Sequence, residues 1–193
     1  NKPTQLADTR AAQPHKRHVA IPPLGLIGDL TVPPDPRGII LFAHGSVSSR
    51  RSSHNTHVSE TLNAKGFATL LFDLLTPQEG QSQSNVFDIP LLADRVVEAS
   101  IWITSEPDLE DLPLGIFGAS TGGGAALVAA AELKGRVSAV VSRGGRPDLA
   151  WDFLPEVISP TLLVVGSLDH DVIKLNQKAL AALTCTKELA IVP

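Results

Sequence analysis

The chain has 193 residues, of which 43% are hydrophobic and 19% charged, and its formal net charge is −4. This composition is typical of a globular domain that removes roughly 70% of its extended-chain surface from water, and the negative charge disfavours binding to nucleic acid or to anionic membranes. The sequence contains no apolar run near the roughly 20 residues that span a bilayer, and its single cysteine, Cys185, excludes an internal disulfide. We therefore expect one cytoplasmic domain over residues 1–193.

The chain begins with a polar leader, residues 1–17, followed by two short stretches at 18–22 and 24–32 that prolines separate. These stretches predict an antiparallel hairpin at a sheet edge. Strands are then expected at residues 38–43, 67–73, 114–117, 137–141, 161–165 and 189–192, and helices at residues 53–65, 89–104, 123–133 and 172–183. Continuous apolar strands that alternate with helices predict a three-layer α/β fold with a mostly parallel sheet.

Polar residues follow the ends of the predicted parallel strands at residues 44–51, 73, 120, 143–146 and 169–171. Ligands bind at the carboxyl ends of the strands in such sheets, so we expect the functional site at that edge. The stretch at residues 147–160 holds one small helix, around 149–154, and is too short for a large lid. The site is therefore expected to be shallow and open.

The string Gly118-Ala-Ser-Thr-Gly122 stands between an apolar strand and an alanine-rich stretch. This pattern indicates a nucleophile elbow, in which a serine occupies a strained strand-to-helix corner and small residues two positions away let the backbone fold back. Ser120 is therefore the candidate catalytic nucleophile. A glycine-rich turn that binds a phosphate or a cofactor is the alternative interpretation of the same string.

A serine hydroxyl needs a base to remove its proton and a carboxylate to orient that base. Asp169 is the candidate carboxylate, and Asp171 is its close rival, although Asp171 is the better cap for a helix that starts at about residue 172. Two backbone N–H groups must also hold the negative oxygen formed during acyl transfer. The candidates for this oxyanion hole are the N–H groups of Thr121, directly after the nucleophile, and of Ser46, after the strand at 38–43.

The remaining histidines give no clear base or metal site. His44 is interpreted as a packed support of the loop that holds Ser46, and His170 is expected to be exposed. His54 and His57 lie three residues apart on a predicted helix, but no carboxylate or cysteine spacing completes a set of ligands. We therefore predict no metal and no cofactor.

Arginines stand in two of the loops at the predicted site. Arg50 and Arg51 follow the loop of Ser46, and Arg143 and Arg146 follow the strand at 137–141. Because arginine pairs with carboxylates through two parallel hydrogen bonds, Arg50 and Arg143 are candidates for binding an anionic substrate. The alternative is that these arginines tie loops of the protein together.

Several strings occur together in a characteristic order. They are Phe42-Ala-His-Gly-Ser46 with Ser49-Arg50, residues 68–76, residues 86–92, the elbow, Ser142-Arg-Gly-Gly-Arg-Pro-Asp148 and residues 161–166. From about residue 24 to its end, the chain resembles the α/β-hydrolase superfamily, and within it the dienelactone hydrolase-like serine hydrolases of bacteria. The resemblance implies a small-molecule ester or lactone substrate. Dienelactone hydrolases proper use a cysteine nucleophile, so Ser120 suggests more general ester chemistry.

In that family the catalytic histidine lies in the loop after the last strand, and a final helix follows. The printed sequence ends at Pro193, so the resemblance implies a shortened C-terminal end that lacks the base and the helix. Our main hypothesis is a serine hydrolase that works through an acyl-enzyme. The alternative is a non-catalytic binding protein with the same fold, and acyl transfer to an acceptor other than water would use the same residues.

Overall fold

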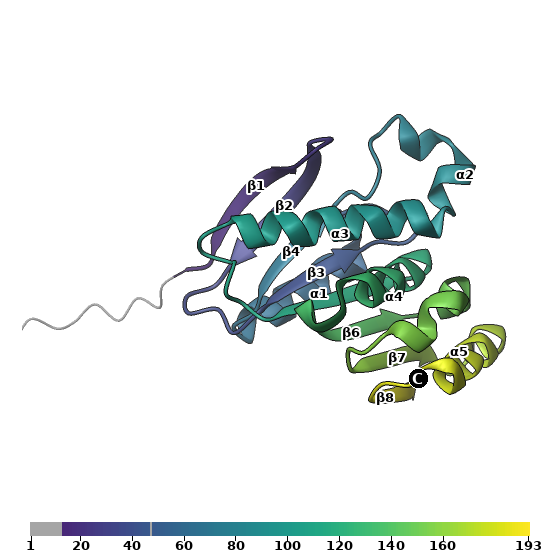
Figure 1. Ribbon diagram of the computed structural model, residues 1–193. Coiled ribbons are helices and arrows are strands. Elements are labelled where there is room, and N and C mark those ends of the chain that lie inside the picture. Colours follow the sequence, from purple (N-terminus) through teal and green to yellow (C-terminus); the bar gives the residue numbers. More distant parts are fainter. Residues whose placement is uncertain (1–12, 47) are drawn as a thin grey trace, which may run out of the picture.

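The structure is a computed structural model that describes residues 13–46 and 48–193, and its centre is a sheet of eight strands in the order β1-β2-β4-β3-β5-β6-β7-β8 (Figure 1). The strands are β1 (His15–Ile21), β2 (Leu26–Val32), β3 (Ile39–Ala43), β4 (Ala68–Phe72), β5 (Leu114–Ala119), β6 (Val137–Arg143), β7 (Thr161–Gly166) and β8 (Lys187–Val192). The α-helices are α1 (Ser53–Ala64), α2 (Gln83–Val86), α3 (Ile89–Ser105), α4 (Thr121–Leu133) and α5 (His170–Ala182). Three 3₁₀ segments complete the elements: η1 (Glu79–Gln81), η2 (Lys134–Arg136) and η3 (Pro147–Glu156).

The N-terminal hairpin is confirmed at the edge of the sheet. β1 pairs antiparallel with β2, and β2 pairs antiparallel with β4. The other six strands, in the order β4-β3-β5-β6-β7-β8, run parallel to one another. β1 begins at His15, three residues earlier than expected, because pairing with β2 continues to Val32. Arg17 also ties this end of the strand to the loop after α3 through Glu106, at 3.2 Å, and Asp108, at 3.3 Å. The first part of the expected leader, residues 1–12, lies outside the described residues.

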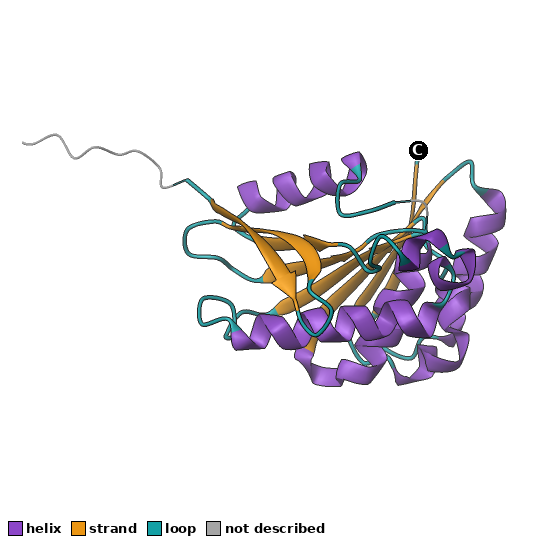
Figure 2. Cartoon of the chain, turned by 90° about the horizontal axis from the view of Figure 1, so that it is seen from above, coloured by secondary structure: helices purple, strands orange, loops and turns teal. Residues whose placement is uncertain are grey.

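Helices pack on both faces of the sheet, as predicted for a three-layer α/β fold. α3, α4 and α5 lie on one face, and α1 is the helix seen on the other (Figure 2). α1 covers a small cluster in which the rings of Phe42 and Phe117 stand 5.2 Å apart and contact Val58 and Leu62. The larger core lies beneath α3 and α4, whose inward side chains are almost fully buried. No helix in the described ranges is both long and apolar enough to cross a membrane.

Two local predictions need correction. α5 begins at His170 instead of about residue 172, so the residue at its N-cap is Asp169. The segment after β4, in which no helix was predicted, contains η1 and α2. This segment is ordered by Glu79, whose carboxylate is bound by Arg95 of α3 with Oε–Nη distances of 2.9 and 2.8 Å. Arg95 is a polar residue on the buried side of an apolar helix, and its partner lies sixteen residues away, so the helical pattern did not reveal the pair.

Candidate active site

Ser120 occupies the sharp corner that the sequence predicted between β5 and α4. Its backbone angles are φ 55° and ψ −127°, a conformation that a non-glycine residue adopts only at a cost of about 1–3 kcal/mol. The corner has no room for larger neighbours, because a Cβ on Gly118 would overlap the backbone of Gly122, and a Cβ on Gly122 would overlap that of Ala43. The strand, the strained serine and the helix therefore form a nucleophile elbow.

The loop after β6 holds the backbone of Ser120 from both sides. The Ser120 N–H donates to the carbonyl of Arg143 at 3.4 Å, and the Arg146 N–H donates to the carbonyl of Ser120 at 3.0 Å. The loop itself is bound by Asn176 of α5, whose fully buried side chain donates to the Gly145 carbonyl at 3.2 Å. Asn176 was not found from the sequence, because a single asparagine inside a helix gives no signal of a bond to a loop thirty-one residues away.

The turn at residues 45–46 packs directly against Ser120. A Cβ added to Gly45 would lie 2.9 Å from Ser120 Cβ and 3.6 Å from Ser120 Oγ. Ser46 follows Gly45 immediately, and Thr121 is the first residue of α4, where an N–H group has no intrahelical acceptor. The structure therefore brings together, around one hydroxyl group, the two segments that carry the predicted oxyanion donors.

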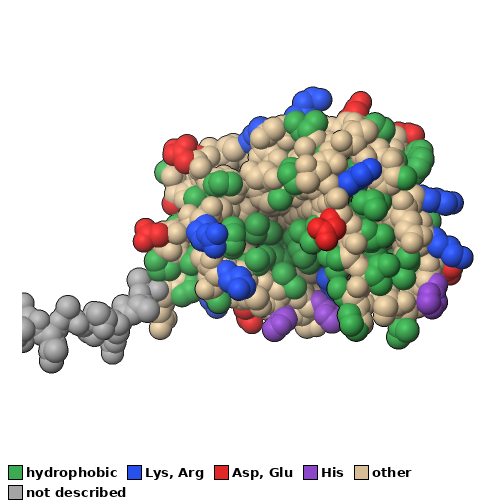
Figure 3. Space-filling view, turned by 90° about the horizontal axis from the view of Figure 1, so that it is seen from below, with side chains coloured by type: hydrophobic (Ala, Val, Ile, Leu, Met, Phe, Trp, Pro, Cys, Tyr) green, Lys and Arg blue, Asp and Glu red, His purple; other side chains and the backbone are tan. Residues whose placement is uncertain are grey.

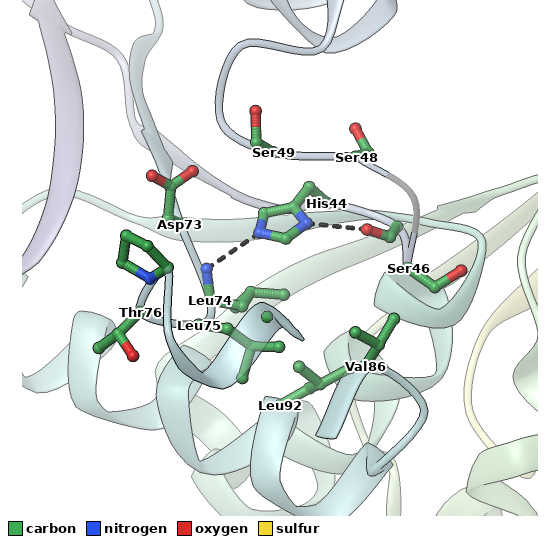
Figure 4. A pocket seen from close by; sticks show the side chains of 13 residues that line it. His44, Ser46, Ser48, Ser49, Asp73, Leu74, Leu75, Thr76, Val86 and Leu92 are labelled. Atoms are coloured by element: carbon green, nitrogen blue, oxygen red, sulfur yellow. Dashed lines mark hydrogen bonds between the residues drawn. The ribbon is translucent and has the colours of Figure 1, made fainter. Parts of the chain in front are cut away.

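His44 supports this turn as the sequence analysis expected. Its buried ring bridges the Gly45 carbonyl, 2.9 Å from Nδ1, and the Leu74 N–H, which donates to Nε2 at 3.0 Å (Figure 4). An Nε2 that accepts a hydrogen bond carries no proton, so the ring is neutral with its proton on Nδ1. Burial lowers the pKa of His44 below its ordinary value, which keeps this neutral form. Both ring nitrogens are thus occupied by the backbone.

A cavity of about 220 Å³, which we call the apolar pocket, opens beside the 45–46 turn. Its apolar wall comes from the segment after β4 and from α3, and consists of Leu74, Leu75, Pro77, Val86 and Leu92. Figure 4 shows Leu75, Val86 and Leu92 on one side, with Ser48 and Ser49 on the loop across from them. The pocket was not foreseen, because no helix was predicted in the segment that forms much of its wall.

The ion pair of Glu79 and Arg95 holds this wall in place. Arg95 also donates to the Leu74 carbonyl at 3.2 Å, and Glu79 Oε1 accepts from the Thr76 N–H at 2.9 Å. The hydrogen bonds from Arg95, together with the one from Thr76, lower the pKa of Glu79 to about 2. The side chain of Arg95 is only 8% exposed, so a charge that is largely removed from water organises the pocket.

Asp169 stands at the carboxyl end of β7, at the N-cap position of α5. Its side chain makes no capping hydrogen bond, and the residue is exposed, so its carboxylate is free to orient another group. The predicted helix cap was wrong. Asp171 lies inside the first turn of α5 and is not the cap, which Asp169 occupies instead.

The contacts of Arg50 correct its expected role in substrate binding and match the loop-tying alternative. Its Nη1 lies 2.6 Å from Asp73 Oδ2, its Nε lies 3.2 Å from Asp29 Oδ2, and its backbone N–H also donates to Asp73. With the side chain only 12% exposed and bound to two carboxylates, Arg50 ties the loop after β3 to β2 and to the end of β4. This guanidinium is already committed to carboxylates of the protein.

Arg146 and Arg143, the other two arginines near the site, differ in their contacts. Arg146 binds Asp148 through two hydrogen bonds, of 3.0 and 2.9 Å. Arg143 is the last residue of β6, in register with Ala119 beside the elbow, and its buried Nε has no partner among the described residues. Arg143 therefore remains the candidate for an anionic group, whereas Arg146 is paired within its own loop.

The other histidines considered as a base or as metal ligands lie at exposed positions. His54 and His57 lie on the exposed side of α1, and His170 is exposed at the start of α5. Within residues 13–46 and 48–193, no group of three His, Cys, Asp or Glu side chains is arranged to hold a metal ion.

Comparison with known proteins shows structural relatives of this chain. The crystal structure of dienelactone hydrolase from Anabaena variabilis is 52% identical to this chain and superposes with a TM-score of 0.90, over 94% of this chain and 87% of that one. A structure of Est1E from Butyrivibrio proteoclasticus with bound ferulic acid is 18% identical, with a TM-score of 0.75 over 92% of this chain and 89% of that chain. At that identity the likeness shows the fold alone.

The curated relatives carry a different name. Two Mycobacterium tuberculosis proteins called "Putative phosphoribosyl transferase" are 57% identical over 171 residues, which make up 89% of this chain and 39% of each relative. The chain thus spans about two fifths of the length of those proteins. No protein-family model matches the chain. Because the chain is 52% identical to the Anabaena relative and covers 87% of it, it belongs to the dienelactone hydrolase-like family of the α/β-hydrolase fold.

Proposed function

We propose that this protein is a serine hydrolase that cleaves carboxylic esters or lactones through an acyl-enzyme. The observation that carries the proposal is the strained backbone of Ser120, at φ 55°, with the 45–46 turn packed against its side chain. A serine hydroxyl beside the two segments that carry candidate backbone N–H donors is an arrangement that acyl transfer uses, and it supports the proposal. Membership of a family whose structural relative is named dienelactone hydrolase supports the same class of reaction.

In the proposed reaction, Ser120 Oγ attacks the carbonyl carbon of the ester while a histidine takes the hydroxyl proton. The backbone N–H groups of Ser46 and Thr121 hold the negative oxygen of the tetrahedral intermediate. Its collapse breaks the bond to the alcohol oxygen, which leaves with the proton from the histidine. Water then attacks the acyl-enzyme while the histidine takes a proton from it, and collapse of the second tetrahedral intermediate breaks the bond to Ser120 Oγ. The carboxylic acid is released, and the histidine returns the proton to Ser120 Oγ.

The base in this scheme is a histidine oriented by Asp169. We assign it to none of the described histidines, because both nitrogens of His44 bind the backbone and His54, His57 and His170 are exposed. We place it in a segment that follows Pro193, as the family resemblance implies. The free carboxylate of Asp169 is the group that supports this placement.

The test is turnover of 4-nitrophenyl acetate by the full-length protein and by its Ser120→Ala variant. We expect hydrolysis by the wild type and a loss of at least about a thousandfold in the variant. Product analysis in the presence of an added alcohol distinguishes hydrolysis from acyl transfer. Equal turnover by the two proteins would remove Ser120 from the mechanism.

A non-catalytic binding protein is the alternative. In favour of it, the described residues supply a nucleophile, an acid and oxyanion donors but no assigned base. A full-length protein that turns over no ester, and whose Ser120 does not react with a fluorophosphonate, would support this alternative. The name of the Mycobacterium relatives belongs to proteins of which this chain spans 39%, and we assign phosphoribosyl transfer to no residue described here.

A further inference from the structure

The apolar pocket lies where one side of a bound ester would extend. It is lined by Gly45 and Ser46, and Gly45 packs against the nucleophile. A carbonyl oxygen held by the Ser46 N–H would therefore direct one of the two groups attached to the ester toward this cavity. The leucines, Pro77 and Val86 of its wall offer this group apolar contacts, across from the more polar side that Ser48 and Ser49 form.

Charge in this pocket is of one sign. Asp73 is the charged side chain that lines it among the described residues, and no lysine or arginine of the described ranges does so. The guanidinium that pairs with Asp73 is shared with Asp29 and belongs to Arg50, which lines a separate groove on the side of Asp29 and α1. An anionic group in the pocket would lose water to apolar walls and would face a carboxylate, so its binding is disfavoured.

We infer that the apolar pocket is the subsite for an uncharged apolar group of the substrate, which rests on the proposed ester hydrolysis. Its volume of about 220 Å³ exceeds the roughly 150 Å³ of an apolar cavity that binds benzene. The group is therefore a phenyl ring or an aliphatic chain of similar bulk. Small neutral aryl or alkyl esters, and not esters with a carboxylate on this side, are the inferred substrate class. Figure 3 shows hydrophobic side chains gathered around a hollow on the face that is seen from below, and the inference concerns the apolar pocket alone.

The inference is tested by binding rather than by turnover, on full-length protein that carries Ser120→Ala. The probes are phenylacetamide and phenylacetate, which have the same shape and differ in charge, and dissociation constants are measured by NMR titration. We expect phenylacetamide to bind at least about tenfold more tightly than phenylacetate, a difference of about 1.4 kcal/mol.

Two substitutions locate the binding. Val86→Phe fills the pocket from its apolar wall and is expected to weaken phenylacetamide binding by at least about tenfold. Phe87→Ala is the matched control, because this neighbouring side chain is 49% exposed and does not line the pocket, and it should leave the dissociation constant unchanged. Val86→Ala, which widens the pocket, provides a second variant if the larger side chain disturbs folding, and should shift the preference toward a bulkier amide.

A further substitution tests whether the Asp73 carboxylate disfavours an anionic probe. Asp73→Asn removes the carboxylate while Arg50 keeps its contact with Asp29, so the preference for the amide over the acid should shrink by about tenfold or more. Equal binding of the two probes by the parent protein, tighter binding of phenylacetate, binding of neither probe, or a Val86→Phe variant that binds normally would each overturn the inference.

Failure of the proposed function is separable from failure of the pocket inference. If the wild type hydrolyses no ester but the Ser120→Ala protein binds phenylacetamide in a Val86-dependent manner, the pocket stands and ester hydrolysis falls. If the wild type hydrolyses 4-nitrophenyl acetate but the Ser120→Ala protein binds neither probe, ester hydrolysis stands and the pocket inference falls.

Discussion

Gly45 and Ser120 are in direct van der Waals contact, and the space between them admits no further carbon. A Cβ on Gly45 would lie 2.9 Å from Ser120 Cβ and 3.3 Å from the carbonyl oxygen of Ala119. Two loops that are seventy-five residues apart in the sequence thus meet at one point, at the carboxyl ends of the adjacent strands β3 and β5. The distance from the proposed nucleophile to the turn that holds Ser46 is set by this contact.

Gly45→Ala should therefore impair ester hydrolysis. The added methyl group must push the turn away from Ser120, which displaces the Ser46 N–H and costs about 1–3 kcal/mol of stability. We expect turnover of 4-nitrophenyl acetate by the full-length protein to fall by about a hundredfold, the effect of losing one oxyanion donor. Gly135→Ala is the control, because a Cβ there meets nothing within 4 Å. Unchanged turnover in the Gly45 variant would show that the turn does not serve the reaction.

Ser120→Gly should stabilise the protein while it abolishes hydrolysis. Glycine adopts φ 55° without strain, which stabilises the folded state. This gain exceeds the cost of the greater conformational entropy of glycine in the unfolded chain, so the net gain is about 1 kcal/mol. Ser120→Ala keeps the Cβ, so it should lose activity without this gain. Thermal melts of the two variants compare them directly, with an expected difference of about 3 °C for a chain of this size. A glycine variant that melts no higher than the alanine variant would mean that the corner is not strained.

The fold followed from the sequence because its signals are local. A buried parallel strand is recognised from a run such as residues 38–43, and the elbow from five residues around Ser120 that demand a strand before them and a helix after them. The antiparallel edge was predicted from the prolines that separate the first two strands, whereas the order of the strands in the sheet was not predicted. The same local signals gave the position of Ser46 and Thr121 relative to the strands.

The parts of the site that the sequence did not predict depend on contacts between distant residues. Arg50 stands at a position that suits substrate binding equally well, and only its contacts with Asp29 and Asp73 show that it is committed to the protein. The wall of the apolar pocket depends in the same way on Glu79 and Arg95. Charged side chains are common in loops and helices, so neither residue type reveals a partner until the chain is folded.

The ion pair of Glu79 should make stability depend on acidic pH. Arg95 lowers the pKa of Glu79 from 4.5 to about 2 in the folded protein, so the unfolded chain takes up a proton first. The stabilisation is present in full above pH 4.5 and is lost as the pH falls from 4.5 toward 2. Glu79→Gln should remove about 2 kcal/mol at pH 7, and its free energy of unfolding should vary less across this range.

Urea unfolding of the wild type and of Glu79→Gln at a series of pH values measures this effect. Glu110→Gln serves as the control, since Glu110 is exposed and makes no ion pair among the described residues. Equal losses of stability in the two variants at pH 7 would contradict the role given to the pair.

His44 should produce a second pH dependence, nearer to neutrality. Burial lowers its pKa below 6.5 in the folded protein, so below pH 6.5 the unfolded chain binds a proton that the folded protein excludes. Stability should fall as the pH drops from 6.5 toward the folded pKa, with a limiting slope of about 1.4 kcal/mol per pH unit. Protonation would also abolish the acceptor for the Leu74 N–H, and with it one support of the 45–46 turn. Urea unfolding at a series of pH values between 5 and 8 gives the free energy of unfolding as a function of pH. This free energy should depend less steeply on pH for His44→Gln than for the wild type, whereas His54→Gln, at an exposed position on α1, should keep the wild-type dependence. Identical pH dependence in all three proteins would mean that burial does not lower the pKa of His44.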